Sequence, residues 1–173
     1  MRQVKINSTT GTEIVTTADV KLYSRIDTTA DDTLIARMIT QARIWCENYV
    51  SRDIVAKNRT YYMDSTNGIF DIPFAPVSSI SSVTIDGTAS TDYTMLGLDN
   101  ETMELDGGAS EKVKVTYITT GLDDSLLIQA ILQLTATYYD NRSDVFEGGS
   151  KFGQIEIPTS VKNILSSYRS MFI

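Results

Sequence analysis

The fold is decided by residues 31–50, which read DDTLIARMITQARIWCENYV. Apolar residues recur there at steps of one, three and four, which is the period of one face of an α-helix. Thr29 is placed to cap this helix, and Asp31 and Asp32 suit the positive end of its dipole. The sequence therefore predicts a helix of about 30 Å that ends near Val50. Its apolar stripe comprises Leu34, Ile35, Met38, Ile39, Ala42, Trp45, Cys46, Tyr49 and Val50. Its polar face comprises Arg37, Thr40, Gln41, Glu47 and Asn48.

Shorter segments on both sides carry the same helical period. Thr16 and Asp19 have the spacing of a capping box, which predicts a short helix over residues 16–24. A second apolar stripe predicts a helix over residues 123–141, and Pro158 suits the first turn of a last short helix. These two stripes comprise Leu126, Leu127, Ala130, Ile131, Leu134 and Tyr138, and then Val161, Ile164, Leu165 and Tyr168.

The middle of the chain, residues 58–119, has the composition of a β-sheet. Clusters of β-branched and aromatic residues alternate there with turn residues. Val113, Val115 and Tyr117 alternate with polar residues, which indicates one buried face. The predicted strands are Arg59–Met63, Gly68–Ile72, Ser79–Asp86, Tyr93–Leu96, Thr102–Leu105 and Lys112–Ile118.

Together these patterns predict an α+β protein. Residues 1–57 form an N-terminal helical part, residues 58–119 an inserted antiparallel β subdomain, and residues 120–173 a C-terminal helical part. The two helical parts are expected to pack as one antiparallel bundle, from which the β subdomain projects. A length of 173 residues suits one domain with such an insert.

Composition narrows the function. The chain has no histidine and a single cysteine, Cys46, which excludes His-based triads, His-ligated metals and an intramolecular disulfide. Its net charge of −7 argues against nonspecific binding to DNA phosphates. We find neither an apolar run of membrane-spanning length nor the apolar core of a signal peptide, so we expect a cytosolic protein or one built into an assembly there. We expect no catalytic residue, no cofactor and no metal.

Catalysis by paired carboxylates is the first alternative to a non-enzymatic function. The pairs at residues 31–32 and 123–124 stand at helix starts, where capping explains them better than catalysis. A further acidic cluster lacks the spacing of a calcium loop and is expected to be a solvated hairpin. A hydrolase using acids of the β subdomain stays a remote alternative. This cluster comprises Asp99, Glu101, Glu104 and Asp106.

A binding module for a glycan or a host surface is the second alternative. It requires an exposed aromatic platform on the β subdomain. A purely structural interpretation instead places the same rings in that subdomain's core. Cys46 likewise lies on an apolar stripe, where a buried thiol is favoured over a nucleophile. The platform candidates are Tyr61, Tyr62, Phe70 and Tyr93.

Two features go beyond an ordinary domain. The sequence ends in three apolar residues, which either remain unordered or fill a groove on a partner. Arg142 follows a helix end, where it either caps the last carbonyls or reaches a neighbouring subunit. Arg142 begins a polar, glycine-bearing loop over residues 142–157.

Several stretches of this sequence resemble the signatures of phage head–tail connector (adaptor) proteins. They cover about half of the chain, at both ends and in the right order. The β middle resembles the inserts of the larger members, and Ser24 departs from the large apolar residue usual before Arg-Ile-Asp. The stretches are Ala18-Asp19-Val20-Lys21, Arg25-Ile26-Asp27, Asp31-Asp32-Thr33-Leu34-Ile35, Ala42-Arg43, Glu47-Asn48-Tyr49, residues 130–142, and residues 157–169 with Val161, Leu165, Tyr168 and Arg169.

The resemblance implies a structural virion protein of the neck, assembled in the host cytoplasm. Such proteins form a homo-oligomeric ring of about twelve copies beneath the portal protein, extend the DNA channel and dock tail, stopper or tail-terminator proteins. DNA then passes an acidic lumen without specific binding. On this basis we expect the portal to be docked by Tyr168, Arg169, Met171, Phe172 and Ile173. We expect the lumen or a neighbouring subunit to be reached by Arg142, Asp144, Glu147 and Lys151.

Overall fold

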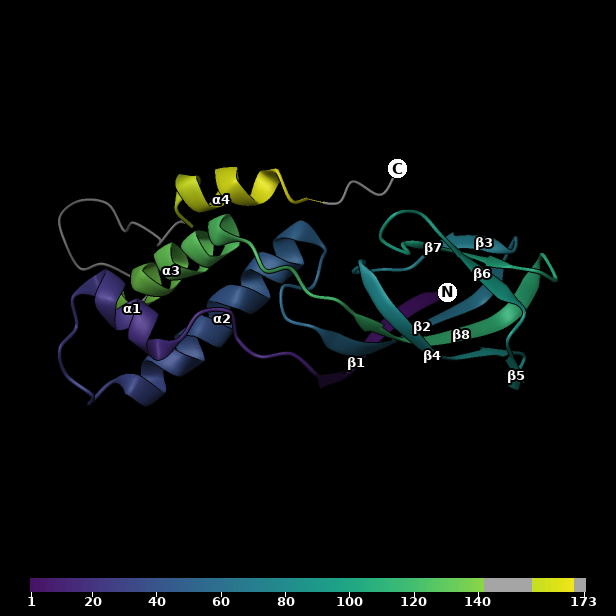
Figure 1. Ribbon diagram of the computed structural model, residues 1–173, viewed down its shortest axis with the longest axis horizontal. Coiled ribbons are helices and arrows are strands. Elements are labelled where there is room, and N and C mark those ends of the chain that lie inside the picture. The colour runs from purple at the N-terminus through teal and green to yellow at the C-terminus, as the bar shows by residue number, and fades with distance from the viewer. Residues whose placement is uncertain (142–156, 170–173) are drawn as a thin grey trace. The chain divides into compact units, whose positions relative to one another are not determined.

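The computed structural model describes residues 1–141 and 157–169 (Figure 1). The chain forms two compact units, and each is made of two stretches of sequence. One consists of Met1–Thr12 and Ser51–Leu122, here called the β unit, and the other of Glu13–Val50 and Asp123–Ile173, here called the helical unit. The α+β class and the antiparallel sheets are confirmed.

The helical unit contains α1 (Thr17–Ser24), α2 (Asp32–Val50), α3 (Ser125–Asp140) and α4 (Thr159–Ser166) among its described residues. The predicted capping box is present: the Asp19 carboxylate accepts from the Thr16 backbone N–H at 2.8 Å, and the Thr16 hydroxyl accepts from the Asp19 N–H at 3.2 Å. The long helix begins at Asp32, after a turn in which the Asp32 N–H donates to the Thr29 carbonyl.

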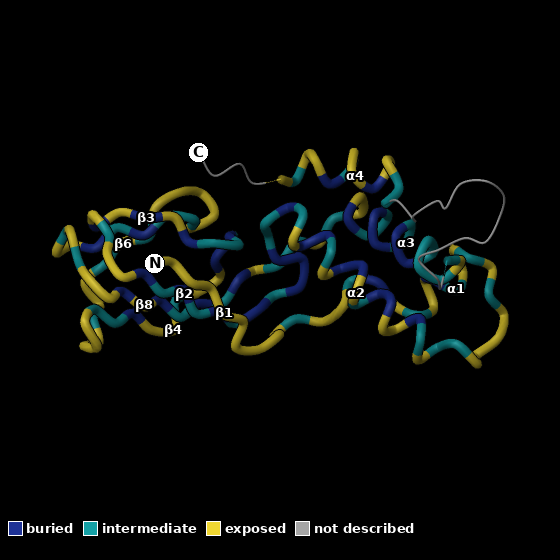
Figure 2. The backbone as a smooth tube through the Cα atoms, turned by 180° about the vertical axis from the view of Figure 1, so that it is seen from behind, coloured by how far each residue is buried: buried dark blue, intermediate teal, exposed yellow. Residues whose placement is uncertain are grey.

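The core of the helical unit forms where α3 packs against α1, α2 and α4. Most of its side chains come from the predicted apolar stripes, because a helix that repeats apolar residues at this period has one face to bury. Val15 and Val20 lie outside those stripes, and the stripe residue Leu126 is 50% exposed. Figure 2 shows the buried residues following α2 and α3. The fully enclosed members are Val15, Val20, Ile35, Ala42, Cys46, Val50, Leu127, Ala130, Ile131, Leu134, Val161 and Leu165.

The β unit contains two antiparallel sheets. The larger has the order β1-β2-β8-β4-β5, and the smaller has the order β3-β7-β6. The strands are β1 (Arg2–Thr9), β2 (Lys57–Thr66), β3 (Ile69–Asp71), β4 (Val77–Ile85), β5 (Thr88–Ser90), β6 (Tyr93–Leu96), β7 (Thr102–Leu105) and β8 (Ser110–Thr119).

A single apolar core lies between the two sheets. Met63, Val113 and Val115 of the larger sheet and Met103 and Leu105 of the smaller one are almost fully enclosed in it. Alternation places these residues on one face of their strands, as the sequence predicted for β8. The smaller sheet therefore covers the middle of the larger one.

Two strands were not predicted. Residues 2–9 were assigned to the N-terminal helical part, but they form β1 and pair with β2, from Thr9 opposite Lys57 to Arg2 opposite Met63. Every residue of β1 is exposed, so the strand lacks the buried face from which strands are recognised in a sequence. Residues 51–57 likewise belong to the β unit. The short β5 pairs with β4.

Candidate functional site

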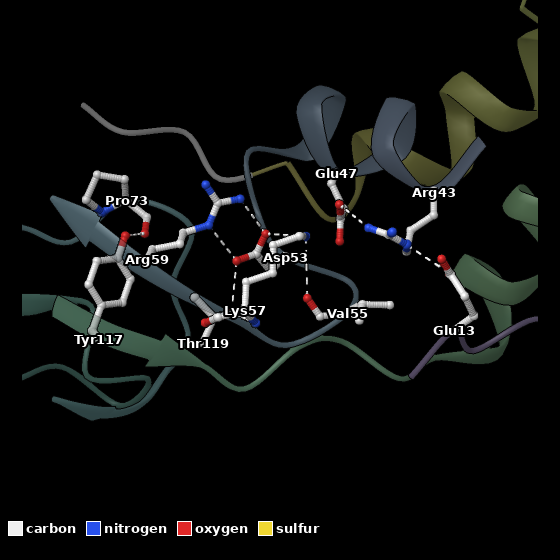
Figure 3. A network of polar contacts seen from close by, with 10 residues as sticks. All are labelled: Glu13, Arg43, Glu47, Asp53, Val55, Lys57, Arg59, Pro73, Tyr117 and Thr119. Carbon is white, nitrogen blue, oxygen red and sulfur yellow. Dashed lines mark hydrogen bonds and ion pairs between the residues drawn. The ribbon is translucent and has the colours of Figure 1, made fainter. Parts of the chain in front are cut away.

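A buried ionic cluster, which sequence reasoning missed, anchors the β unit (Figure 3). The fully enclosed carboxylate of Asp53 accepts hydrogen bonds from Lys57 Nζ at 2.9 Å and from Arg59 Nε and Nη2 at 2.8 and 2.6 Å. Thr119 Oγ1 donates to it as well, at 2.9 Å. The guanidinium carbon of Arg59 also lies 3.7 Å from the centre of the Phe74 ring. We call Asp53, Lys57, Arg59 and Thr119 the Asp53 cluster.

The Asp53 cluster keeps its charges because they are paired. Burial opposes ionisation of Asp53, but the hydrogen bonds from Arg59 and Lys57 outweigh it and hold the pKa of this carboxyl below its ordinary value. Lys57 and Arg59 are themselves almost fully buried. Removing Asp53 would take away the charge that pairs with Arg59 and Lys57 in the interior, so the cluster fixes the start of β2 against the end of β8.

A second network holds the helical unit together. Arg43 on α2 donates from Nη1 to Glu47, one turn further on, at 2.7 Å, and from Nε to Glu13 at 2.8 Å. The sequence placed Glu47 on the polar face of the helix, opposite the apolar stripe, but the residue is buried, with 3% of it exposed. Ionic pairing with Arg43 permits its burial. Arg43 and Glu47 belong to the signature stretches quoted above, so in this fold those residues stabilise the helix.

The cysteine and most of the paired carboxylates that the sequence offered as candidates have structural roles. Burial raises the pKa of the Cys46 thiol to about 12, as expected for a buried hydrophobe. Asp124 caps α3 by accepting from the Leu126 N–H at 2.8 Å, and Asp32 pairs with Lys21 at 2.9 Å. Asp31 accepts from the Tyr139 hydroxyl at 2.7 Å. Within residues 1–141 and 157–169, no group of three or more acidic or cysteine side chains could hold a metal ion.

The four aromatic candidates do not form an exposed platform. Tyr61 and Phe70 are 4% and 5% exposed, with ring centres 6.2 Å apart, and Tyr93 packs partly buried against the same core. Tyr62 lies on the other face of β2, because alternate residues of a strand point to opposite sides. The interpretation of Tyr61 and Phe70 as core residues is confirmed.

The C-terminal docking candidates fall partly within the described residues. The Tyr168 side chain hydrogen-bonds Asp124, and the Arg169 guanidinium lies 5.8 Å from the centre of the Tyr49 ring. Both contacts tie the end of α4 to the helical unit. Met171, Phe172 and Ile173 lie outside the described residues, and so do Arg142, Asp144, Glu147 and Lys151.

The free edge of the larger sheet is an exposed apolar surface that sequence reasoning also missed. Val4 and Ile6 of β1 lie opposite Tyr61 and Arg59 of β2, on the face of the sheet that holds the core. Tyr61 and Arg59 are about 5% exposed, whereas Val4 and Ile6 are 39% and 49% exposed.

No described helix is both long and apolar enough to span a membrane.

Known structures share this fold over its whole length. The chain superposes with a TM-score of 0.72 on a protein from the neck of an empty gene transfer agent particle computed with C6 symmetry, with 16% identity over 99% of this chain and 97% of that one. A chain from the virion of the native gene transfer agent particle gives a TM-score of 0.72, with 15% identity over 99% of this chain and 97% of that one. A chain from the neck of the native particle computed with C12 symmetry gives a TM-score of 0.67, with 15% identity over 96% of this chain and 97% of that one. No curated protein sequence matches the chain.

The sequence itself matches one family model over most of its length. The matching family model is described as "Head completion protein", and it covers residues 13–171. The match confirms the resemblance to head–tail connector proteins. Because it spans nearly the whole chain, the protein belongs to the head completion protein family.

Proposed function

We propose that the protein is a structural component of a virion neck, placed between the head and the tail of a tailed particle. The observation that carries the proposal is the likeness of fold to chains from gene transfer agent necks, which spans 99% of this chain and 97% of the other. Membership of the head completion protein family supports the same place. The role is non-enzymatic: the charged groups at the centre of each unit are held in structural ion pairs.

In that place the protein forms a ring beneath the portal protein. The related necks have C6 and C12 symmetry, which supports a ring of about twelve copies. A ring closes only through a heterologous contact, in which one surface of a subunit meets a different surface of the next. The exposed sides of the helices and of the β unit are the candidates for that contact.

The ring extends the DNA channel, and the acidic chain suits that task. A net charge of −7 gives DNA no counter-ion-releasing contact with the lumen, so the nucleic acid slides past without adhering. Residues 142–157, with Arg142, Asp144, Glu147 and Lys151, reach the lumen or a neighbouring subunit. Cross-linking that places this segment only on the outer wall would refute that role.

The end of the chain docks the portal, and the opposite side of the ring receives tail, stopper or tail-terminator proteins. Tyr168 and Arg169 sit at the end of α4 and lead into Met171, Phe172 and Ile173, whose apolar side chains suit a groove on the portal. A variant lacking residues 169–173 is expected to fold but to lose attachment to the portal. Normal attachment of that variant would contradict the docking role.

The decisive test is the copy number of this chain in purified particles. Quantitative mass spectrometry, normalised to the portal protein, is expected to give about one copy per portal subunit. Hundreds of copies per particle would instead indicate a shell or tail-tube protein. Absence from particles would overturn the proposal.

A further inference from the structure

The larger sheet of the β unit has an open, uncovered edge at β1. The smaller sheet covers β2, β8 and β4, whose core-facing residues are buried, but the core does not extend to β1. Val4 and Ile6 continue the buried row of Tyr61 and Arg59 into solvent. β1 is also an edge strand, with β2 as its one hydrogen-bonded neighbour among the described strands. A strand of eight residues with an open edge and apolar side chains is a site to which another chain can add.

The charges of the β unit identify what covers this edge. The stretch from residue 1 to residue 12 contains Arg2 and Lys5 and no acidic residue. Residues 86–111 contain seven acidic residues and no basic one. Two large apolar side chains stand out of that acidic stretch, since Leu96 is 37% exposed and Leu98 fully exposed. One chain thus carries a basic apolar edge and an acidic apolar edge, which are complementary between copies.

The acidic stretch also has an open strand edge. β6 is the last strand of the smaller sheet, with β7 as its described neighbour. Tyr93 and Met95 of β6 pack toward the core, so the alternate residue Leu96 lies on the outer face of that sheet. In the antiparallel register Glu104 of β7 lies opposite Thr94, which places its carboxylate on the same outer face.

We propose that β1 of one copy binds the β6 region of the next copy, residues 92–101, with Val4 and Ile6 covered by Leu96 and Leu98. Arg2 and Lys5 then face the carboxylates of the neighbouring acidic stretch. Because β1 and β6 are different surfaces, the contact is heterologous, which is the kind of contact that the proposed ring requires. The inference rests on that proposed function and assigns the residues that join its subunits.

Charge reversal tests the contact. Variant X carries Arg2→Glu and Lys5→Glu, and variant Y carries Asp92→Lys and Asp99→Lys. Each alone brings like charges together and is expected to weaken self-association roughly tenfold or more, measured by analytical ultracentrifugation. An equal mixture of X and Y is expected to associate again, because X offers an acidic β1 to the basic β6 region of Y and the reverse.

The matched control for X carries Lys112→Glu and Lys114→Glu. These lysines are exposed on β8, away from the open edge, and the change in net charge is the same. The control is expected to associate like the wild-type chain. Equal weakening of X and the control would overturn the proposal, because net charge and not the edge would then be responsible. So would a wild-type chain that stays monomeric at about 1 mM, where even weak contacts are populated.

Disulfide trapping tests the same contact in assembled particles. Cys46 is fully buried, so the introduced cysteines are the thiols expected to form disulfides. A chain with both Ile6→Cys and Leu98→Cys is expected to give a ladder of cross-linked oligomers on oxidation. A mixture of the two single variants is expected to give dimers, and each single variant alone none.

The outcomes separate this inference from the proposed function. Particles that contain the chain at portal stoichiometry but yield no disulfide between positions 6 and 98 overturn the contact and leave the neck role intact. A disulfide between two copies of position 6 also overturns it, because the contact would then be isologous. Absence of the chain from particles overturns the neck role and with it the ring.

Discussion

Replacing Asp53 by asparagine is predicted to destabilise the β unit severely. Asparagine preserves the shape of the side chain but removes the negative charge that pairs with Lys57 and Arg59, both almost fully buried. Breaking a buried ion pair by removing one partner costs about 3–5 kcal/mol. Asp53 accepts from four donor groups, and the asparagine oxygen retains part of this bonding, which favours the lower end, about 3 kcal/mol.

Urea unfolding followed by far-ultraviolet circular dichroism measures this effect. With a denaturant dependence of about 2 kcal/mol per molar, the expected loss lowers the midpoint by about 1.5 M. The matched control is Asp86→Asn, which breaks the pair between Asp86 and Lys112, both of them exposed, and is expected to shift the midpoint far less. Equal midpoints for the two variants would refute the reasoning, because the Asp53 cluster would then contribute no more than a surface pair.

Three further predictions concern other groups. Because the pKa of Asp53 is lowered in the folded chain, its contribution to stability is present above pH ~3.9 and is lost as the pH falls through the folded value; acid titration of Asp53→Asn should therefore show a shallower loss of stability than that of the wild-type chain. Cys46, whose pKa is raised from 9.0 to about 12, should react with a thiol reagent roughly a thousandfold more slowly in the folded chain than in urea, and fast labelling would contradict its burial. Tyr117→Phe removes the hydrogen bond to the Pro73 carbonyl, 2.6 Å long, and should cost about 1 kcal/mol in thermal or urea unfolding; an unchanged midpoint would show that water replaces it.

The helices could be predicted from the sequence because their signals are local. Thr16 and Asp19 form a capping box within four residues, and the apolar period of residues 31–50 is long enough to exclude a strand. Strands β6 and β7 were predicted to the residue, since turn residues bound them on both sides. The longer strands β2, β4 and β8 extend past their predicted ends to Lys57, Val77 and Thr119, which are buried.

The polar interior could not be predicted, because its signals are distant in sequence. Lys57 and Arg59 occupy core-facing positions of β2 but look like solvated residues until Asp53 is placed beside them. The burial of Glu47 could not be predicted from the helical period, which places it opposite the apolar stripe; in the fold it accepts a hydrogen bond from the buried Arg43. β1 was missed because its partner, β2, begins almost fifty residues after β1 ends, and it buries no face of its own.

The placement of β1 also bears on synthesis at the ribosome. β1 is made before its pairing partner, which appears only after α1 and α2, and β2 itself completes its pairing when β8 is made. At bacterial or eukaryotic rates of about 5–20 residues per second, the nascent strand waits several seconds with Val4 and Ile6 unprotected. Arg2 and Lys5 then act as gatekeepers that discourage premature pairing with other nascent chains. The same two charges would thus protect the chain before it folds and select its neighbour afterwards.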